Sequence, residues 1–337
     1  MVKMSTMTHI AFTICSNNYL GQALALKDSF LRHHPSFKFY IVLVDKRHPS
    51  IDYDIIAPAK LLPIADIEGI DLDDLITRYY IIELNTAVKP SVFKHLAKKH
   101  PQTEALYYLD PDLFFYDSLK ETNRALHEAT AVLTPHVLSP IPRDGKQPDE
   151  NTFFRFGIYN LGFLGIDPSK TEAKKLLDWW EERVLKFGYD RPNKGYFVDQ
   201  LWMALAPLFF EGVEVIHSYG YNMAPWNLHE RRIVSRGSQQ ILMNDNSTLV
   251  FYHFSKLSDN DQDISREYDR YTFKDIPFLK ELYEEYRGFL HQVGHEKFKK
   301  ISIAYSVKKN PTKKEKSWLG HKLERLAQYL IRLSRKI

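Results

Sequence analysis

Strand-length apolar runs alternate with segments of helical periodicity along most of the chain, and this alternation limits the folds that the sequence can adopt. Apolar, β-branched or aromatic runs of strand length cover residues 9–15, 37–44, 105–109, 158–166, 213–217 and 249–254. Apolar residues recur at helical spacing over residues 19–34, 86–100, 169–187, 196–208 and 277–290. The alternation predicts an α/β protein with an open sheet flanked by helices. In such sheets, ligands bind at the carboxyl ends of the strands.

The composition is that of an ordinary globular protein. Of the 337 residues, 44% are hydrophobic and 26% are charged, which excludes a disordered, collagen-like or disulfide-rich chain. Cys15 has no second cysteine to pair with, and no apolar run approaches the ~20 residues of a membrane span. Residues 1–8 lack the apolar core of a signal peptide. We therefore expect a cytoplasmic protein.

Positive charge gathers at the C-terminal end of the chain. Residues 294–337 carry 13 Lys and Arg against three Glu, although the net charge of the whole chain is only +4. Within residues 318–337, Leu and Ile recur at steps of three and four and predict a basic amphipathic helix. Such a helix can lie on the inner face of an anionic membrane, dock on its own domain or pair in a coiled coil; we favour the membrane. No nucleic-acid-binding module accompanies the charge, so we expect no nucleic-acid partner. We divide the chain into a body of residues 1–293 and a tail of residues 294–337.

Two carboxylates follow the apolar run at residues 105–109. Asp110 and Asp112, separated by Pro111, stand between pairs of aromatic residues. Hard carboxylate oxygens at the end of a strand suit Mg²⁺ or Mn²⁺ that bridges a diphosphate. Asp-Pro-Asp is also favourable turn chemistry, so the pattern alone leaves a simple turn open.

With this motif, most of residues 8–257 resembles the nucleotide-sugar glycosyltransferases of the GT-A fold, an open mixed sheet, and most closely the family-8 type of bacterial envelope-glycan synthesis. The matching segments are residues 13–19 (TICSNNY), 83–90 (ELNTAVKP), 159–165 (YNLGFLG), 198–200 (VDQ) and 251–256 (FYHFSK). They resemble the first strand with its nucleotide loop, the segment before the metal strand, and the family's F-N-A-G, D-Q-D and H-x-x-G-x-x-K-P-W elements. This chain departs from the family by Asn17 and Asn18 in the nucleotide loop, by Leu201 in place of the second Asp, and by the missing G-x-x-K-P-W.

The resemblance implies a role for each matching residue. Asp110, Asp112 and His253 would hold Mn²⁺ or Mg²⁺. Asp199 would bind hydroxyls of the donor sugar, and Gln200 would lie near the reacting carbon. The donor-binding residues would be Cys15, Ser16, Asn17, Tyr19, Lys89, Asp110, Asn160, Gly162 and Lys256.

Residues 221–227 (YNMAPWN) combine an aromatic ring with side-chain amides, as surfaces that hold sugars do. Asn222, Trp226 and Asn227 are therefore candidate acceptor-binding residues. A loop anchored by a buried Trp226 explains the same pattern equally well.

The sequence thus predicts a hexosyltransferase that moves a glycosyl group from a nucleoside diphosphate sugar, in our interpretation a UDP-sugar, to a hydroxyl of a glycan or lipid-linked glycan. The resemblance implies retention of configuration at the transferred carbon. The loop at residues 139–151 can close over the donor and exclude water. Two alternatives are a non-catalytic sugar-binding protein on the same fold and a nucleotidyltransferase. The second needs a glycine-rich phosphate loop, whereas residues 16–21 contain one glycine.

Overall fold

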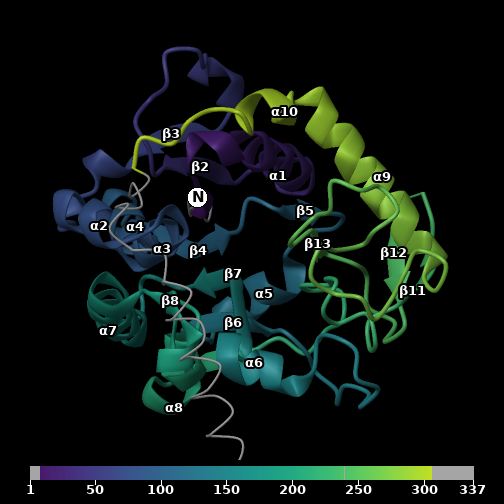
Figure 1. Cartoon of the computed structure of the whole chain (residues 1–337). Helices are drawn as coiled ribbons and strands as arrows, with labels where there is room; N and C mark the ends of the chain where they lie inside the picture. The colour runs from purple at the N-terminus through teal and green to yellow at the C-terminus, as the bar shows by residue number, and fades with distance from the viewer. Residues whose placement is uncertain (1–7, 239, 306–337) are drawn as a thin grey trace, which may run out of the picture.

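A seven-stranded mixed sheet forms the centre of the molecule in a computed structural model, which describes residues 8–238 and 240–305 (Figure 1). Its strand order is β10-β6-β7-β4-β1-β2-β3, with β7 antiparallel to both of its neighbours and the other pairs parallel. The strands are β1 (Thr8–Cys15), β2 (Lys38–Leu43), β3 (Lys60–Pro63), β4 (Thr103–Leu109), β6 (Ala131–Pro135), β7 (Tyr159–Ile166) and β10 (Val213–Val215). The expected open α/β sheet is confirmed. The amphipathic helix expected at residues 318–337 lies outside the described residues.

Helices cover the sheet, and three short ribbons lie beside it. The α-helices are α1 (Leu20–His33), α2 (Leu72–Arg78), α3 (Ile81–Ala87), α4 (Lys89–Lys99), α5 (Lys120–Leu126), α6 (Glu150–Phe156), α7 (Thr171–Phe187), α8 (Ala206–Phe209), α9 (Pro277–Gln292) and α10 (His295–Phe298). The ribbons pair β5 (Leu113–Phe115) with β13 (Phe251–His253), β8 (Asp190–Arg191) with β9 (Tyr196–Phe197), and β11 (Ile233–Arg236) with β12 (Ile241–Met243).

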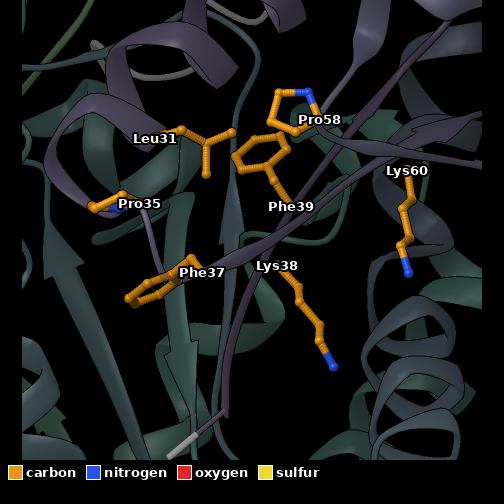
Figure 2. A pocket seen from close by; sticks show the side chains of 7 residues that line it. All are labelled: Leu31, Pro35, Phe37, Lys38, Phe39, Pro58 and Lys60. Atoms are coloured by element: carbon orange, nitrogen blue, oxygen red, sulfur yellow. The ribbon is translucent and has the colours of Figure 1, made fainter.

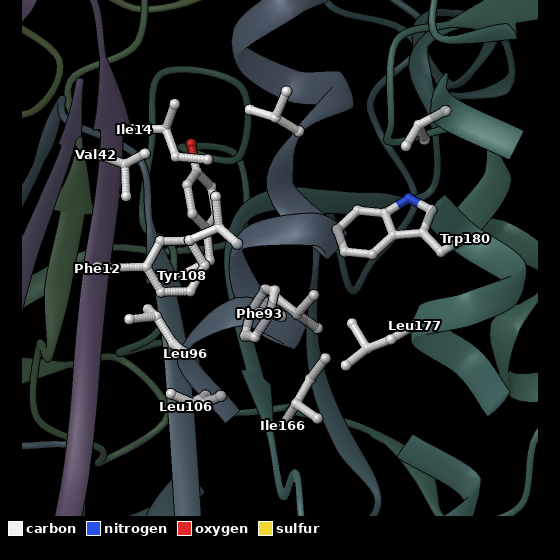
Figure 3. Packing of buried hydrophobic residues seen from close by; sticks show 14 of the residues in the cluster. Phe12, Ile14, Val42, Phe93, Leu96, Leu106, Tyr108, Ile166, Leu177 and Trp180 are labelled. Atoms are coloured by element: carbon white, nitrogen blue, oxygen red, sulfur yellow. The ribbon is translucent and has the colours of Figure 1, made fainter. Parts of the chain in front are cut away.

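Each face of the sheet is covered by its own apolar core, because successive side chains of a strand point to opposite faces. On one face, Phe12 of β1 packs in a core with Phe93 of α4 and Trp180 of α7 (Figure 3). On the other face, Ala11 and Cys15 of β1 belong to a second core, which α1 covers. The site described below lies where these two layers end, at the carboxyl end of β4.

The prediction of a single helix at residues 196–208 is wrong. Tyr196–Phe197 pairs as β9, Val198 has a left-handed φ of +39°, and a 3-10 helix (Trp202–Leu205) precedes the four-residue α8. The left-handed residue interrupts the helical path, and Pro207 lacks a backbone donor. Apolar spacing alone did not reveal either break.

Two segments that lie outside the predicted strands and helices contain ordered structure. Residues 45–70 contain the edge strand β3, which is only four residues long and carries Pro63 at its end. The loop at residues 139–151 runs into α6, which Asp149 caps by accepting a hydrogen bond from the backbone N–H of Thr152. The buried Arg270 anchors this loop by pairing with Asp144 and donating to backbone carbonyls of the loop, so the loop has defined contacts in this conformation.

Candidate metal centre

Two carboxylates and an imidazole meet at the carboxyl end of β4. Asp110 follows β4, Asp112 precedes β5, and His253 ends β13, the antiparallel partner of β5. One ligand atom from each of the three lies within 4.8 Å of the others. The His253 Nε2 is 3.1 Å from Asp112 Oδ1 and 3.9 Å from Asp110 Oδ2. Two carboxylate oxygens and one imidazole nitrogen form a donor set that fits a divalent cation such as Mn²⁺.

The backbone explains why these three residues come together. The N–H of Asp110 donates to the carbonyl of Gly162 on β7 at 2.7 Å, and the N–H of Phe254 donates to the carbonyl of Asp112 at 2.9 Å. One bond joins the end of β4 to β7, and the other joins the Asp-Pro-Asp turn to the strand that carries His253. The pairing of β5 with β13 thereby places His253 beside the turn, although it lies about 140 positions further along the chain.

Neighbouring side chains orient the three candidate ligands. The Tyr108 hydroxyl donates to Asp110 Oδ1 at 2.5 Å, and the His253 Nδ1 lies 3.4 Å from Asn222 Oδ1. Since an amide oxygen accepts, Nδ1 is the donor in this contact, and Nε2 points to the carboxylates. Partners of this kind around a metal ligand fix its orientation and its tautomer.

Gly162 provides the space that the cluster occupies. A Cβ atom there would lie 2.6 Å from His253 Cε1 and 2.8 Å from Asp110 Oδ2. Both distances are shorter than real Cβ contacts, so any side chain at this position would displace the imidazole and the carboxylate. The glycine is required by close approach and not by an unusual φ.

The imidazole and the carboxylates of the cluster shift each other's pKa values. Burial by itself would raise the pKa of Asp112, but the adjacent His253 outweighs burial and holds that pKa below its ordinary value. Burial would likewise lower the pKa of His253, but Asp112 and Asp110 raise it. A bound cation would take the place of the imidazole proton as the positive charge in this cluster.

A buried lysine connects the cluster to Asp199. The Lys89 Nζ lies 2.8 Å from Asp199 Oδ2 and 3.8 Å from Asp110 Oδ1, and it donates to the Leu161 carbonyl at 3.0 Å. It also sits 4.1 Å from the centre of the Tyr108 ring. Burial raises the pKa of Asp199 more than Lys89 lowers it. Lys89 thus lies between the buried carboxylate of Asp199 and the carboxylate of Asp110, whose side chain is 28% exposed.

Gln200 is held at both ends of its amide. Its Oε1 accepts from the Leu161 N–H at 2.9 Å, and its Nε2 donates to the Phe156 carbonyl at 2.6 Å. The end of α6 can lie close to Gln200 because the next residue is Gly157. Its φ is +116°, and a Cβ atom there would lie 2.9 Å from Gln200 Cγ. Asn160 lies beside Gln200, and its Oδ1 accepts from the N–H of Gly162 at 3.2 Å.

The predicted nucleotide loop after β1 is only partly accessible. Cys15 is buried. Burial, and to a smaller extent the charge of Asp45, raises the pKa of its thiol to about 12. Ser16 is also buried, and its hydroxyl donates to Asn18 Oδ1 at 2.6 Å. Tyr19 is 43% exposed. The burial of its hydroxyl group, and to a smaller extent the charge of Asp112, raises the pKa of that hydroxyl. Among residues 13–19, Tyr19 is therefore the most exposed.

The side chain of Asn17 is bonded to three residues that the sequence did not single out. Its Nδ2 donates to Asp45 Oδ2 at 2.9 Å and to the Lys46 carbonyl at 2.8 Å, and its Oδ1 accepts from the Tyr53 hydroxyl at 2.5 Å. Asp45 is buried. The signal for Asp45 was available: like Asp110, it is an acidic residue that directly follows an apolar strand.

The candidate acceptor residues are buried in a network behind His253. Asn227 accepts from the N–H of Ala224 at 2.9 Å and donates to the carbonyls of His136 and Asn222. The Trp226 ring packs edge to face on His253 with centroids 5.0 Å apart. Asn222 has a left-handed φ of +58°. These contacts support the imidazole from behind, and acceptor binding by the loop stays a prediction.

Lys256 lies at the edge of the site. It has a left-handed φ of +55°, its side chain is 49% exposed, and its Nζ pairs with Glu267 at 3.0 Å. The structure thus gathers most of the predicted residues around one point and leaves Lys256 at the rim. Those that share direct contacts with the cluster or with one another there are Lys89, Asp110, Asp112, Asn160, Gly162, Asp199, Gln200, Asn222, Trp226, Asn227 and His253.

A separate pocket of about 320 Å³ lies away from these residues. It opens between the end of α1 and the starts of β2 and β3, and Figure 2 shows its lining side chains. Five apolar residues and two lysines line it: Leu31, Pro35, Phe37, Lys38, Phe39, Pro58 and Lys60. None of them belongs to the predicted site, whose two carboxylates are partly exposed and whose imidazole is buried.

Comparison with known proteins gives no family model that matches the chain. The chain is 28% identical over 282 residues to the uncharacterized protein YfnF of Bacillus subtilis (strain 168), covering 83% of this chain and 91% of YfnF. It is 26% identical over 247 residues to the uncharacterized protein YfnD of the same strain, covering 72% and 76%.

Solved structures with similar folds include the galactosyltransferase LgtC in complex with donor and acceptor sugar analogs. That superposition has a TM-score of 0.47 at 15% identity and covers 85% of this chain and 96% of LgtC. The bifunctional glycosyltransferase WbbM superposes with a TM-score of 0.49 at 13% identity over 88% of this chain and 52% of WbbM. Both TM-scores lie below 0.5, and the function proposed below rests on the residues of the site. No helix among the described residues has the length and apolarity that crossing a membrane requires.

Proposed function

We propose that the protein is a metal-dependent glycosyltransferase, which moves a glycosyl group from a nucleoside diphosphate sugar to an acceptor hydroxyl. One observation carries the proposal: Asp110, Asp112 and His253 converge at the carboxyl end of β4, next to the buried pair of Lys89 and Asp199. The convergence joins residues that the sequence selected from four separate segments. A plain Asp-Pro-Asp turn would not require His253 and Gly162 beside it.

Asp110, Asp112 and His253 would hold the cation, which when bound offsets the charge that develops on the departing diphosphate. The chain's own residues prepare this arrangement. Tyr108 and Asn222 orient the ligands, and Gly162 keeps the space between them open. We propose Mn²⁺ over Mg²⁺, since imidazole is a better ligand for Mn²⁺.

Asp199 and Gln200 are proposed to act on the donor sugar, as the likeness of residues 198–200 to the D-Q element implies. Lys89 holds Asp199 at 2.8 Å, and two backbone groups fix the Gln200 amide. We propose that Lys89 positions Asp199 and Asp110 from within the protein, since its side chain is buried. Retention at the transferred carbon is proposed on the same resemblance and needs no carboxylate base at the acceptor.

Further details of the proposal rest on the sequence. These are a UDP-sugar donor, hexosyl transfer, a glycan or lipid-linked acceptor, a cytoplasmic location, and membrane contact by residues 318–337. The division into residues 1–293 and 294–337 belongs with them. We propose Ser16, Asn17, Tyr19 and Asn160 as donor-binding residues, with the half-exposed Lys256 at the rim of the site.

The proposal is tested by thermal stabilisation with a panel of nucleoside diphosphate sugars, with and without Mn²⁺. One donor should raise the melting temperature of the native protein only when Mn²⁺ is present, because a ligand that binds the folded state stabilises it by mass action. Asp112→Ala should lose this rise. Asp73→Ala, which removes an exposed carboxylate of α2, should keep it.

Turnover of the same donor separates the candidate functions. Transfer or slow hydrolysis of the sugar that requires Mn²⁺ supports the enzyme. Binding without any turnover would instead favour a non-catalytic sugar-binding protein. If no nucleoside diphosphate sugar stabilises the native protein with Mn²⁺, the glycosyltransferase proposal fails.

A further inference from the structure

The segment that follows α9 crosses the predicted nucleotide loop. Residues 294–305 comprise α10 and an extended stretch, which Figure 1 shows in yellow running from α10 past α1 towards α2. We call residues 294–305 the strap. The strap makes three separate contacts: with the start of α1, with Asp45, which binds the loop after β1, and with the loop after β13.

The first contact seats α10 on the start of α1. A Cβ atom on Gly21 would lie 2.8 Å from His295 Cα and 2.9 Å from His295 Nδ1. The Cα of His295 belongs to the backbone, so it cannot move aside as easily as the end of a flexible side chain can. The contact therefore requires glycine at position 21, directly after the 3-10 turn at Asn17–Tyr19.

The second contact reaches the nucleotide loop through Asp45. The N–H of Ala304 donates to Asp45 Oδ1 at 2.8 Å, while Asp45 Oδ2 accepts from Asn17 Nδ2 at 2.9 Å and from the Asn17 N–H at 3.3 Å. One buried carboxylate thus binds the strap with one oxygen and the loop with the other. Tyr305 then packs against the core on the first face of the sheet.

The third contact joins the strap to the loop that follows β13. Lys299 pairs with Asp259 at 2.8 Å, three residues after Lys256. Both side chains are largely exposed, so this pair contributes little to stability by itself. The strap is therefore held in place mainly by the contact of α10 with α1 and by the hydrogen bond to Asp45.

We infer that the strap positions the donor site by holding residues 16–19 in the conformation that binds a nucleoside diphosphate. The inference rests on the proposed function and makes the strap part of the body, in contrast to the division at residue 293. Its physical basis is the shared carboxylate of Asp45. If Ala304 moves away, the Asp45 carboxylate loses one of the hydrogen bonds that hold it. The side-chain amide and the backbone N–H of Asn17 then no longer have an acceptor in a fixed position. Asp45 and Ala304 are positioning residues and do not touch the donor.

The experiment uses the full chain and two glycine substitutions in helices. Gly21→Ala places a methyl group against His295 and displaces the strap. Gly288→Ala in α9 is the matched control, because no atom lies within 4 Å of its added Cβ. Both changes replace glycine by the better helix former, so helix propensity favours both variants equally.

Hydrogen exchange without any nucleotide tests the strap itself. In Gly21→Ala, the amides of Asn17 and Ala304 should exchange at least tenfold faster than in the native protein, while in Gly288→Ala they should not change. If the strap amides of Gly21→Ala exchange faster and the Asn17 amide keeps its native rate, the strap does not hold the loop and the inference is overturned. Native exchange at both amides in Gly21→Ala overturns it as well.

The affinity for UDP in the presence of Mn²⁺ tests the link to the donor site. Gly21→Ala should bind UDP at least tenfold more weakly than the native protein, with unchanged affinity for Mn²⁺ alone, and Gly288→Ala should match the native protein in both. Native UDP affinity in a Gly21→Ala protein with a loosened strap overturns the positioning role. If the native protein itself does not bind UDP with Mn²⁺, the proposed UDP donor fails, and the exchange result still decides whether the strap holds the loop.

Discussion

Tyr107 and Tyr108 are neighbours on β4, yet their hydroxyl groups serve different parts of the molecule. Successive side chains of a strand point to opposite faces, so Tyr108 belongs to the core beneath α4 and α7 and Tyr107 to the core beneath α1. The Tyr108 hydroxyl donates to Asp110, and the Tyr107 hydroxyl donates to Asn123 at 2.6 Å. A single strand thus offers both a test residue and its control for the candidate metal centre.

Tyr108→Phe should weaken Mn²⁺ binding by roughly 10- to 100-fold, the usual effect of removing a group that orients a metal ligand. Tyr107→Phe should leave Mn²⁺ affinity unchanged and cost about 1 kcal/mol of stability, since it also loses one hydrogen bond. Calorimetric titration with Mn²⁺, together with urea unfolding, measures both. Equal Mn²⁺ affinity in the two variants would show that the Tyr108 hydroxyl does not orient Asp110.

At the scale of single elements, β7 shows how one strand serves both packing and site. Gly162 leaves space for Asp110 and His253, whereas Gly165 leaves space for the Tyr107 ring and Val132. A Cβ at Gly165 would lie 2.6 Å from Tyr107 Cε1. The two glycines are three residues apart in one antiparallel strand, and each permits a different close approach.

Alanine at either glycine should destabilise the protein, by about 1–3 kcal/mol for overpacking. Gly162→Ala should in addition abolish detectable Mn²⁺ binding, whereas Gly165→Ala should retain it at temperatures where the variant is folded. Melting curves and Mn²⁺ titrations distinguish the two effects. Retained Mn²⁺ affinity in Gly162→Ala would mean that the cation does not sit between Asp110 and His253.

Elements also show where sequence patterns succeed and fail. The strand before Asp110 and the helices at α1, α4, α7 and α9 follow from periodicity, because each buries a regular apolar stripe. The helix expected at residues 196–208 is wrong, because Val198 takes a left-handed φ that no spacing pattern encodes. The four-residue β3 is too short to show a period of two.

The site was predictable in its ligands but not in its supports. The Asp-Pro-Asp pattern after a buried strand could be interpreted from residue chemistry alone, whereas His253 entered only through a family resemblance. Lys89 and Asp199 were selected separately, and only the structure shows the 2.8 Å pair between them. The bonds that Asp45 makes to Asn17 and Ala304 join residues up to 259 positions apart, which no local pattern contains.

At the scale of the whole molecule, buried neutral histidines make stability depend on pH. Burial lowers the pKa of His136 to about 3, against an unfolded value near 6.5. Below about pH 6.5, His136 binds a proton in the unfolded chain. In the folded protein it binds that proton only below about pH 3. The free energy of unfolding should therefore fall as the pH drops through this window.

Between pH 7 and pH 5, His136 alone should cost about 2 kcal/mol of stability. His136→Gln keeps a donor and an acceptor at this position and removes the titration. Urea unfolding at the two pH values should show that the variant loses about 2 kcal/mol less than the native protein. An identical loss in both proteins would contradict a buried neutral His136. Because the comparison uses the change with pH, a lower overall stability of the variant does not affect it.

The most direct test of the whole account is the position of bound Mn²⁺ in crystals of the protein grown with Mn²⁺ and UDP. Anomalous diffraction measured at the manganese absorption edge locates the ion without reference to any activity. We predict one strong anomalous peak between the carboxylates of Asp110 and Asp112 and the Nε2 of His253, with diphosphate oxygens completing its coordination. An ion held elsewhere, or UDP bound with no ion at these three residues, would contradict the metal centre on which the proposed transferase depends.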